Sequence, residues 1–333
     1  MVTALIFKLT LGLILLFIGG NYLVEGGVTI AKRFKLSPLV IGMTIVGFGT
    51  SAPELIVSIK AAMMGSSGIA LGNVIGSNII NIGFILGLTA IICPISIKKK
   101  SIALDGAIML FTIVLVAIFS IFGNGLSRIE GIILFIGIIF FTVLSIYFGR
   151  NHEQHQDAEV KTKKIMPFWL AIVVILLSCV SLSIGADLLV DGAVNIAKSL
   201  KINEKIIGLT IVAIGTSLPE FSTSLVAVLK KQMDISIGNI IGSNIFNILC
   251  VLGLTSTISP ITFNFQDYIY DFVIMFAFSL LLMLLIMPWK NNIKEFKKSG
   301  SILAFKKYTN GVLGRVSGIV LVLFYIAYVI TLF

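Results

Sequence analysis

Two glutamates of this chain end nearly identical apolar segments, and hydroxyl side chains precede each of them within one helical turn. Glu54 ends the segment TIVGFGTSAPE, and Glu220 ends TIVAIGTSLPE. Residues three and four apart lie on neighbouring faces of a helix, so the threonine and serine of each GTS triplet are expected beside the carboxylate of their own segment. Hard oxygen donors of this kind suit Na⁺, Ca²⁺ or Mg²⁺ and disfavour Zn²⁺ and Cu²⁺. The pattern therefore favours a site for a hard cation.

A second pair of segments adds hydroxyl and amide oxygens. GNVIGSNIIN at 72–81 contains Ser77 and Asn81, and GNIIGSNIFN at 238–247 contains Ser243 and Asn247. In each segment the serine and the last asparagine are one helical turn apart, so their side chains share a face. Neither segment contains cysteine or histidine. Each half of the chain thus supplies one cluster of oxygen donors.

A proline directly before each glutamate is expected to break its helix. Proline lacks a backbone N–H and its ring crowds the carbonyl four residues earlier, which predicts breaks near Gly49 and Gly215. Carbonyl oxygens freed at membrane depth are tolerated where they face protein or a cavity, and there they can bind cations. The candidate carbonyls are those of Gly47, Thr50, Ala213 and Thr216.

The two carboxylates determine the charge of this predicted site. A lone charged side chain near the bilayer centre costs at least about 2.5–3.5 kcal/mol on insertion scales. The nearest bases in the same segments, Lys60 and Lys230, fall toward the helix ends, so bound cations are the expected partners. One Ca²⁺ or two Na⁺ would neutralise both acids, which makes these ions competitors. An empty site with two negative charges is costly to occlude, which favours exchange over leak.

The elements that must position these groups are membrane helices. The 333 residues are 57% hydrophobic and 12% charged, with a mean hydropathy of +1.09, which is outside the usual range of a water-soluble domain. Apolar segments of about 20 residues, the length that crosses a bilayer, recur along the chain. We expect ten of them, the first retained and not cleaved as a signal peptide, at 5–31, 38–64, 68–95, 103–122, 128–148, 167–197, 204–229, 234–260, 266–288 and 312–332.

The two sets of motifs are separated by a constant offset of 166 residues, as between Glu54 and Glu220. The same register relates GNYLVEGGVTIAK at 20–32 to GADLLVDGAVNIAK at 185–198, with one residue of slack at its start, and indicates duplication of a five-helix unit. Because five is odd, the second copy enters the membrane from the opposite face, which predicts an inverted repeat. The expected units are 1–148 and 167–333, joined by a polar cytoplasmic linker at 149–166 in which His152 and His155 are expected to be solvated.

Basic residues gather in alternate loops, which the positive-inside rule assigns to the cytoplasm. These loops hold Lys32, Arg33 and Lys35; Lys98, Lys99 and Lys100; Arg150, Lys161, Lys163 and Lys164; Lys230 and Lys231; and the lysines from Lys290 to Lys307. Both termini are then expected outside the cell. Lys198, Lys201 and Lys205 fall on the opposite face as an exception. The net charge of +10 therefore reports orientation and not a nucleic-acid partner.

The paired GTSxPE and GSNxxxN blocks resemble the two alpha-repeats of the sodium/calcium exchangers, a branch of the calcium/cation antiporter superfamily, and the resemblance to a prokaryotic member extends over nearly the whole chain. It implies Na⁺/Ca²⁺ antiport by alternating access in the cell membrane, with no cofactor and no obligatory protein partner evident. Exchange is expected to be electrogenic if the oxygens around Ser77 and Ser243 hold Na⁺ beyond the two ions that balance the glutamates. The cation ligands that the resemblance implies are Gly47, Thr50, Ser51, Glu54, Ser77 and Asn81 in the first repeat, and Ala213, Thr216, Ser217, Glu220, Ser243 and Asn247 in the second.

Two positions depart from the pattern of relatives. Gly47 replaces an alanine that is common in prokaryotic members, and a carbonyl ligand survives that change. Asn247 stands where some prokaryotic and the potassium-dependent members have aspartate. The site then keeps two central acids, which argues against K⁺ co-transport and resembles the animal potassium-independent branch.

Several alternatives remain open from the sequence. Protons or K⁺ could take part in Ca²⁺ exchange, and the driving gradient distinguishes these cases. Two buried carboxylates could also serve as acid and base in an intramembrane enzyme, although the sequence offers no nucleophile, metal triad or cofactor motif. A channel is a third possibility, against which the cost of an empty doubly charged site speaks.

The other polar residues of the apolar segments have simpler expected roles. The three cysteines Cys93, Cys179 and Cys250 are expected to be buried as small hydrophobic residues. The remaining polar groups are expected to pack helices (Asn73, Asn78, Asn239 and Asn244), to be solvated at helix ends (Glu25, Asp187 and Asp191), or to favour a helix start (Asp105 and Glu130).

Overall fold

The structure is a computed structural model that describes residues 2–123, 125–150, 166–199, 204–286 and 310–332. Helices dominate the described part. Those of the first half are α1 (Val2–Phe34), α2 (Pro38–Ile41), η1 (Gly42–Val46), α3 (Gly47–Thr50), α4 (Ala52–Met63), α5 (Ser67–Ile80), η2 (Asn81–Leu86), α6 (Gly87–Ile92), α7 (Lys99–Phe122) and α8 (Arg128–Arg150). Those of the second half are α9 (Phe168–Ser199), α10 (Glu204–Ile207), η4 (Gly208–Val212), α11 (Ala213–Thr216), α12 (Leu218–Leu229), α13 (Met233–Phe246), η5 (Asn247–Leu252), α14 (Gly253–Ile258), α15 (Phe265–Ile286) and α17 (Arg315–Thr331).

Two short antiparallel strand pairs connect loops that are distant in sequence. β1 (Ile95–Lys98) pairs with β4 (Asn310–Leu313), with Ile95 opposite Leu313. β2 (Gly125–Leu126) pairs with β3 (Ile261–Thr262). Each pair joins a loop of the first half to a loop of the second, and Ile95, Leu126, Ile261 and Leu313 of these strands belong to the main buried cluster.

Seven helices of the described residues are long and apolar enough to cross a membrane, and the bent pair Pro38–Thr50 and Ala52–Met63 makes an eighth candidate. Two further apolar helices, Ala213–Leu229 and Arg315–Thr331, are shorter. Each of these helices overlaps one of the ten segments expected from hydropathy, with ends that differ by a few residues. The protein is therefore an integral multi-pass membrane protein built of helices.

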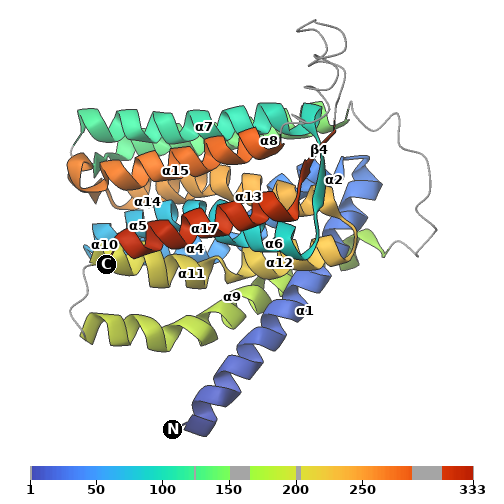
Figure 1. Cartoon of the computed structure of the whole chain (residues 1–333), viewed down its shortest axis with the longest axis horizontal. Helices are drawn as coiled ribbons and strands as arrows, with labels where there is room; N and C mark the ends of the chain where they lie inside the picture. The colour runs from blue at the N-terminus through green and yellow to red at the C-terminus, as the bar shows by residue number, and fades with distance from the viewer. Residues whose placement is uncertain (1, 124, 151–165, 200–203, 287–309, 333) are drawn as a thin grey trace, which may run out of the picture.

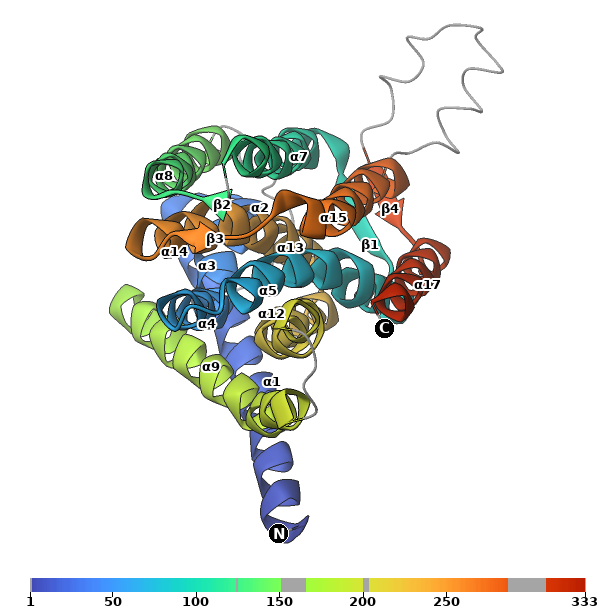
Figure 2. The same ribbon diagram turned by 90° about the vertical axis from the view of Figure 1, so that its left-hand side faces the viewer.

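The helices that carry the motifs lie at the centre of the structure. In Figures 1 and 2, α7, α8 and α15 lie on one side of α4, α5, α12 and α13, and α1 and α9 lie on the other side. The central helices contact across the halves, since α13 packs on α2 and η1 while α5 packs on α10 and η4. Gly42 and Gly238 allow this close approach: a Cβ atom at Gly42 would lie 2.7 Å from the carbonyl oxygen of Ile235, and one at Gly238 would lie 2.6 Å from that of Leu39.

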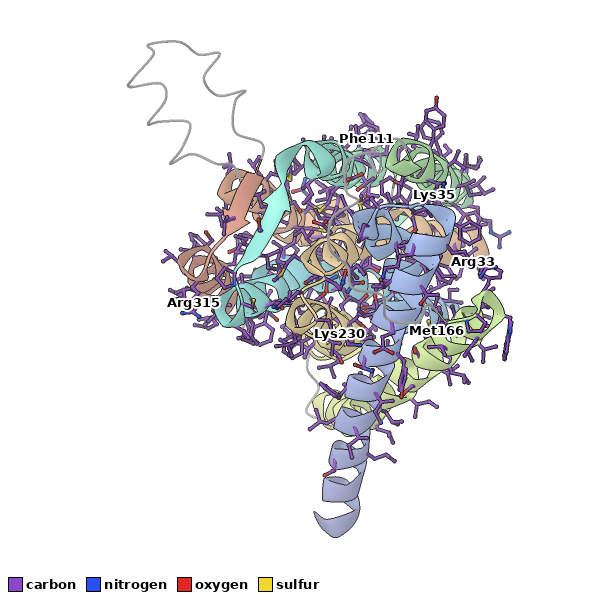
Figure 3. All side chains as sticks on the ribbon, turned by 90° about the vertical axis from the view of Figure 1, so that its right-hand side faces the viewer. Arg33, Lys35, Phe111, Met166, Lys230 and Arg315 are labelled. Carbon is purple, nitrogen blue, oxygen red and sulfur yellow. The ribbon has the colours of Figure 1, made fainter. Side chains whose placement is uncertain are left out.

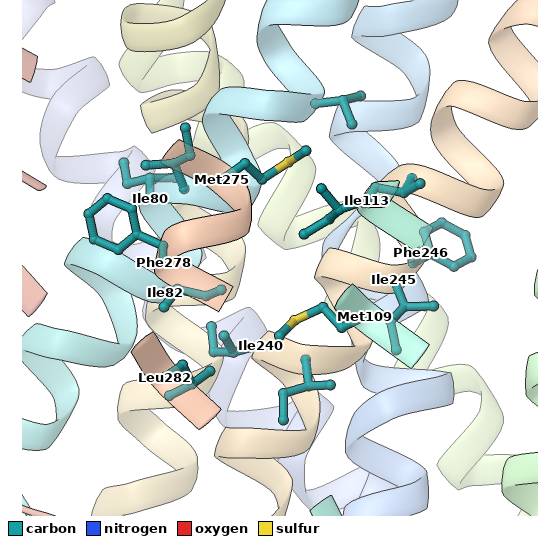
Figure 4. Close-up of a cluster of buried hydrophobic side chains, with 14 of the residues drawn as sticks. Ile80, Ile82, Met109, Ile113, Ile240, Ile245, Phe246, Met275, Phe278 and Leu282 are labelled. Carbon is teal, nitrogen blue, oxygen red and sulfur yellow. The ribbon is translucent and has the colours of Figure 1, made fainter. Parts of the chain in front are cut away.

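Large apolar side chains surround these central helices. The main buried cluster combines residues of both halves, and Figure 4 shows part of it with Met109 of α7, Met275 of α15 and Phe278 of α15 directed into it. A second cluster lies between α1, α9 and α12. The motif helices are thus held between two apolar layers that keep lipid and water away from their polar groups.

The central helices are interrupted where proline was expected to break them. Ser51 separates α3 from α4 with φ −84° and ψ 7°, and the two sides of the break differ in direction by 44°. Ser217 separates α11 from α12 with φ −85° and ψ 0°. The breaks lie two residues after Gly49 and Gly215, because each proline occupies the first turn of the new helix, where its missing N–H costs nothing.

A second irregularity was not predicted from the sequence. The wide-turned π-helical segments η1, η2, η4 and η5 begin at Gly42, Asn81, Gly208 and Asn247. Such turns are rare and often occur at functional sites. Two of them start at predicted ligand residues.

Several basic residues that the structure describes share one end of the helices. Arg33 and Lys35 at the end of α1, Lys230 at the end of α12 and Arg315 at the start of α17 gather at one end of the helices, which Figure 3 views directly. The exception, Lys205 of α10, lies toward the opposite end, and its Nζ is 2.6 Å from Oδ2 of the fully buried Asp271. Lys205 therefore neutralises a buried acid, which explains its place on that face.

Candidate cation-binding site

Glu54 and Glu220 are fully buried in the first turns of α4 and α12. The hydroxyl of Ser51 donates to Oε1 of Glu220 at 2.8 Å, and that of Ser217 donates to Oε1 of Glu54 at 3.4 Å. Each serine thus contacts the acid of the other half. Spacing within one segment predicts each serine beside the carboxylate of its own segment, whereas the hydrogen bonds of the structure run to the carboxylate of the other half.

The threonines of the two GTS triplets also contact the opposite half. Thr50 Oγ1 donates to Oδ1 of Asn239 at 3.1 Å and lies 3.4 Å from Ser243 Oγ. Thr216 Oγ1 donates to Oδ1 of Asn73 at 3.0 Å and lies 3.4 Å from Ser77 Oγ. Both contacts have a counterpart shifted by 166 residues.

Asn73 and Asn239 do more than the packing role expected of them. The Nδ2 group of Asn73 donates to the backbone carbonyl of Glu54 at 3.3 Å, and that of Asn239 donates to the carbonyl of Glu220 at 3.4 Å. Each also contacts a threonine of the opposite half, so each asparagine fixes the backbone of one glutamate against the other motif. The sequence offered one signal for this role: the first asparagine of each GNxIGSN segment occurs at equivalent positions of the two repeats.

Asn81 and Asn247 begin η2 and η5, and both are fully buried. The Nδ2 group of Asn81 donates to Oδ1 of Asn244, and that of Asn247 donates to Oδ1 of Asn78, each at 3.1 Å. Within the described residues they therefore join the site through two further asparagines that sequence reasoning had assigned to packing.

Four buried oxygens of predicted ligands accept no hydrogen bond from the described residues. They are Glu54 Oε2, Glu220 Oε2, Asn81 Oδ1 and Asn247 Oδ1. A buried acceptor without a donor is destabilising, and a buried carboxylate more so. Oxygens in this condition suit a bound cation, which would supply the missing positive partner.

The carbonyls of Gly47 and Ala213 are not freed by the breaks, in contrast to the expectation. Gly47 O accepts the N–H of Ser51 at 3.0 Å and a hydroxyl contact from Ser243 at 3.5 Å. Ala213 O accepts the N–H of Ser217 at 3.1 Å. The reason is position: proline removes the donor to the carbonyl four residues earlier, which is that of residue 49 or 215. A carbonyl oxygen has two lone pairs, so these atoms keep capacity for a second partner.

The composition of the site is that of a hard-cation site. Among the described residues, no group of three or more His, Cys, Asp or Glu side chains is placed to hold a metal ion. The donors are two carboxylates surrounded by hydroxyl and amide groups. His152 and His155 lie outside the described residues.

The acids outside the site can be compared with the roles expected of them. Glu130 accepts the N–H of Ser127 at 2.7 Å in a capping box, which confirms its expected place at a helix start. Asp105 is instead buried inside α7, so its expected helix-start role is wrong. Glu25 is partly exposed as expected and also forms an ion pair with Lys230 at 2.8 Å. Asp187 is exposed as expected, and the side chain of Asp191 lies outside the description.

The cysteines were expected to be buried. Cys250 is buried in the main apolar cluster, whereas Cys93 and Cys179 are partly exposed. All three are free thiols.

Fold and site together define a helical membrane protein with a buried, oxygen-lined centre for hard cations, made by two related halves. A family model described as sodium/calcium exchanger protein matches residues 4–147 and 170–333. The chain belongs to the sodium/calcium exchanger family, and the resemblance inferred from its motifs is confirmed. It is a transporter and not an enzyme, and Na⁺ and Ca²⁺ are the ions of its family.

Individual relatives agree over most of their length. The chain is 39% identical to the putative antiporter CaxA of Alkalimonas amylolytica, over 86% of this chain and 90% of that protein. It is 32% identical to the sodium/calcium exchanger MaX1 of Methanosarcina acetivorans, over 100% and 99%. Its structure is similar to that of the sodium-calcium exchanger NCX_Mj soaked with 2.5 mM Na⁺ and 0.1 mM Ca²⁺, with a TM-score of 0.77, 34% identity and full coverage of both chains.

Proposed function

We propose that this chain exchanges Na⁺ for Ca²⁺ across the cell membrane by alternating access, with both ions binding between Glu54 and Glu220. The observation that supports this most directly is the set of four buried oxygens without donors, two of them carboxylate and two amide. A buried carboxylate or amide oxygen without a donor is destabilising, and a bound cation would supply the positive partner that these four atoms need. The relatives named above as exchangers support the same pair of ions.

The proposed ligands are the twelve residues implied by the motifs. They are Gly47, Thr50, Ser51, Glu54, Ser77 and Asn81 with Ala213, Thr216, Ser217, Glu220, Ser243 and Asn247. Support comes from the contacts that bring the serine and threonine hydroxyls of each half to the acid or the hydroxyl of the other. With two acids, the site is neutralised by one Ca²⁺ or by two Na⁺, so the two ions compete for it.

We further propose K⁺-independent and electrogenic exchange. Asn247 is a neutral amide, so the centre has no third carboxylate to balance an additional K⁺. Hydroxyls and carbonyls around Ser77 and Ser243 offer more oxygens than one Ca²⁺ needs, which would allow Na⁺ to bind beyond the two ions that balance the acids. Net positive charge then moves with Na⁺.

The proposed architecture is ten membrane helices in two inverted five-helix repeats, 1–148 and 167–333, joined by the cytoplasmic linker 149–166. The recurrence of cross-half hydrogen bonds at a shift of 166 residues supports it: Thr50 to Asn239 has the counterpart Thr216 to Asn73. The shorter helices α12 and α17 would complete the count. Both termini would be outside a plasma membrane, with lipid and the two ions as the partners required, and impermeant labelling of a terminal tag on intact cells tests that placement.

Calcium-45 uptake into proteoliposomes tests the function. Purified protein is reconstituted with Na⁺ inside and diluted into Na⁺-free buffer with ⁴⁵Ca²⁺. Uptake is expected only with the outward Na⁺ gradient, and it should be unchanged when K⁺ is removed. It should be faster when the interior is made positive and slower when it is made negative, because net positive charge leaves with Na⁺. Equal uptake driven by a proton gradient without Na⁺ would reject Na⁺ coupling, and uptake without any counter-ion would indicate a channel.

A further inference from the structure

Four asparagines meet where α5 and η2 of the first half contact α13 and η5 of the second. Two of them, Asn81 and Asn247, are proposed ligands; the other two, Asn78 and Asn244, lie one turn earlier. All four are at most 1% exposed. The amide groups form two hydrogen bonds across the halves, Asn81 to Asn244 and Asn247 to Asn78.

The side chains of Asn78 and Asn244 are held in one orientation by their own N–H groups. Asn78 Nδ2 donates to the backbone carbonyl of Asn244, and Asn244 Nδ2 donates to that of Asn78, each at 3.3 Å. A thioether also accepts from each amide nitrogen: Met275 Sδ is 3.6 Å from Asn78 Nδ2, and Met109 Sδ is 3.8 Å from Asn244 Nδ2. Figure 4 shows these two methionines directed into the apolar cluster.

This arrangement leaves only the oxygens of Asn78 and Asn244 facing the ligand amides. An oxygen accepts and does not donate, so the group opposite must be the N–H₂ end of Asn247 or Asn81. The oxygen of each ligand amide is thereby turned away from Asn78 and Asn244. That agrees with the unpaired state of Asn81 Oδ1 and Asn247 Oδ1 within the described residues.

The orientation matters because the two ends of an amide are nearly equal in shape and opposite in polarity. A carboxamide rotated by half a turn would present N–H groups to a cation, which repel it, in place of a coordinating oxygen. Without an acceptor at residues 78 and 244, neither orientation of the ligand amide would be favoured by its neighbours.

We propose that Asn78 and Asn244 are positioning residues that fix the carboxamides of Asn247 and Asn81 with both oxygens directed to the ion-binding centre. The inference deepens the proposed function of the site and depends on it. Each positioning residue belongs to one half and acts on the ligand of the other half. These two hydrogen bonds therefore make both halves necessary for a complete ligand set.

A double-mutant cycle tests the positioning role of Asn78 and Asn244. Asn78→Ala removes the acceptor that orients Asn247, and loss of one hydrogen bond predicts an increase of about two- to tenfold in the apparent KM for Ca²⁺. In the Asn247→Asp background the same substitution is expected to change KM less than twofold, because a carboxylate presents an oxygen in either orientation. Asn244→Ala with Asn81→Asp gives the reciprocal cycle.

Met275→Leu is the matched control, since it removes the thioether acceptor while the bond from Asn78 to the carbonyl of Asn244 remains; its KM is expected within twofold of the parent. Gel filtration in detergent verifies folding, and Asn78→Ser and Asn244→Ser replace any alanine variant that does not fold. Equal losses in the asparagine and aspartate backgrounds would indicate a packing role and overturn the proposal. Absence of Na⁺-driven ⁴⁵Ca²⁺ uptake by the parent protein would instead reject the proposed function itself.

Discussion

The two long helices that begin the halves, α1 and α9, differ in how they contact the central helices. α1 is joined to α12 at two levels: Ser222 Oγ donates to the carbonyl of Leu16 at 2.6 Å, and Lys230 Nζ is 2.8 Å from Glu25 Oε1. At the corresponding positions of α4, residues 56 and 64 are Ile and Met, with 49% and 78% of their surface exposed. Residues 56 and 64 therefore cannot form with α9 the hydrogen bond and the ion pair that Ser222 and Lys230 form with α1.

This difference contrasts with the symmetry of the ion site, where hydrogen bonds recur in pairs. The halves share the chemistry of binding but not the contacts of the long helices. In an inverted repeat, α1 and α9 would control access from opposite sides. The two polar contacts of α1 with α12 are expected to favour a state that is closed at the end where Lys230 lies and open at the other.

The largest expected effect concerns the symmetric part. Glu54→Gln and Glu220→Gln should each abolish Ca²⁺ exchange to a similar degree, because each removes half of the central charge. Loss of a buried charge partner costs about 3–5 kcal/mol, which corresponds to more than about 100-fold in binding. The measurement is Na⁺-driven ⁴⁵Ca²⁺ uptake by folded protein in proteoliposomes.

Glu130→Gln serves as the control for this pair, since Glu130 only caps α8. Its uptake is expected to equal that of the parent. Preserved Ca²⁺ transport by either central variant would remove that glutamate from the site, and a large difference between the two would show that the symmetry of the hydrogen bonds does not extend to the ion.

The repeated motifs allowed most of this symmetry to be predicted. The repeat register, the helix segments and the approximate breaks came from periodicity and from the chemistry of proline. The pairing of Ser51 with Glu220 could not be predicted, because the three-residue rule applies within one helix and the break lies on Ser51 itself. The role of Asn78 and Asn244 was missed for a related reason: cross-half contacts depend on how the halves pack, which local spacing does not contain.

The second effect is expected at the long helices. With Cys93, Cys179 and Cys250 replaced by serine, Gly20→Cys with Ser222→Cys should form a disulfide, since a Cβ at Gly20 would lie 2.9 Å from Ser222 Oγ. We expect the cross-link to stop exchange while ⁴⁵Ca²⁺ binding persists, because α1 must slide on the core for the site to change sides. Reduction should restore transport.

The corresponding pair in the other half is Ala186→Cys with Ile56→Cys. In the state described here it is expected to cross-link more slowly, because Ile56 and Met64 offer α9 no polar group equivalent to those of Ser222 and Lys230. Undiminished turnover in a fully cross-linked sample of either pair would refute the sliding of these helices, and equal cross-linking rates would remove the difference between them.

A smaller effect is expected from the ion pair. Lys230→Met replaces the lysine by the residue that stands at the equivalent position 64, and it removes a partly exposed ion pair worth about 0.2–1 kcal/mol. The population of the state with α1 fastened should fall by up to about fivefold relative to the alternative. Hydrogen–deuterium exchange should then increase at the backbone of 20–31, whereas the neighbouring Lys231→Met should leave it unchanged. Equal exchange in both variants would mean that the pair does not hold α1.

The smallest expected effect comes from building the missing lysine into the first half. Met64→Lys places a base at the position equivalent to Lys230, and residue 191 of α9, the equivalent of Glu25, is already Asp. When α9 approaches α4 in the opposite-facing state, this lysine could pair with that acid, so the substitution should stabilise that state. The gain is smaller than the loss in Lys230→Met because Met64 is 78% exposed and water screens the new pair.

Combined with Lys230→Met, it should move the protein further toward the opposite-facing state, with increased deuterium uptake at 20–31 and reduced uptake at 186–197. Met64→Gln controls for polarity without charge. If Met64→Lys instead protected 20–31, the two long helices would not act in opposition, and the asymmetry of their contacts would have no part in the transport cycle.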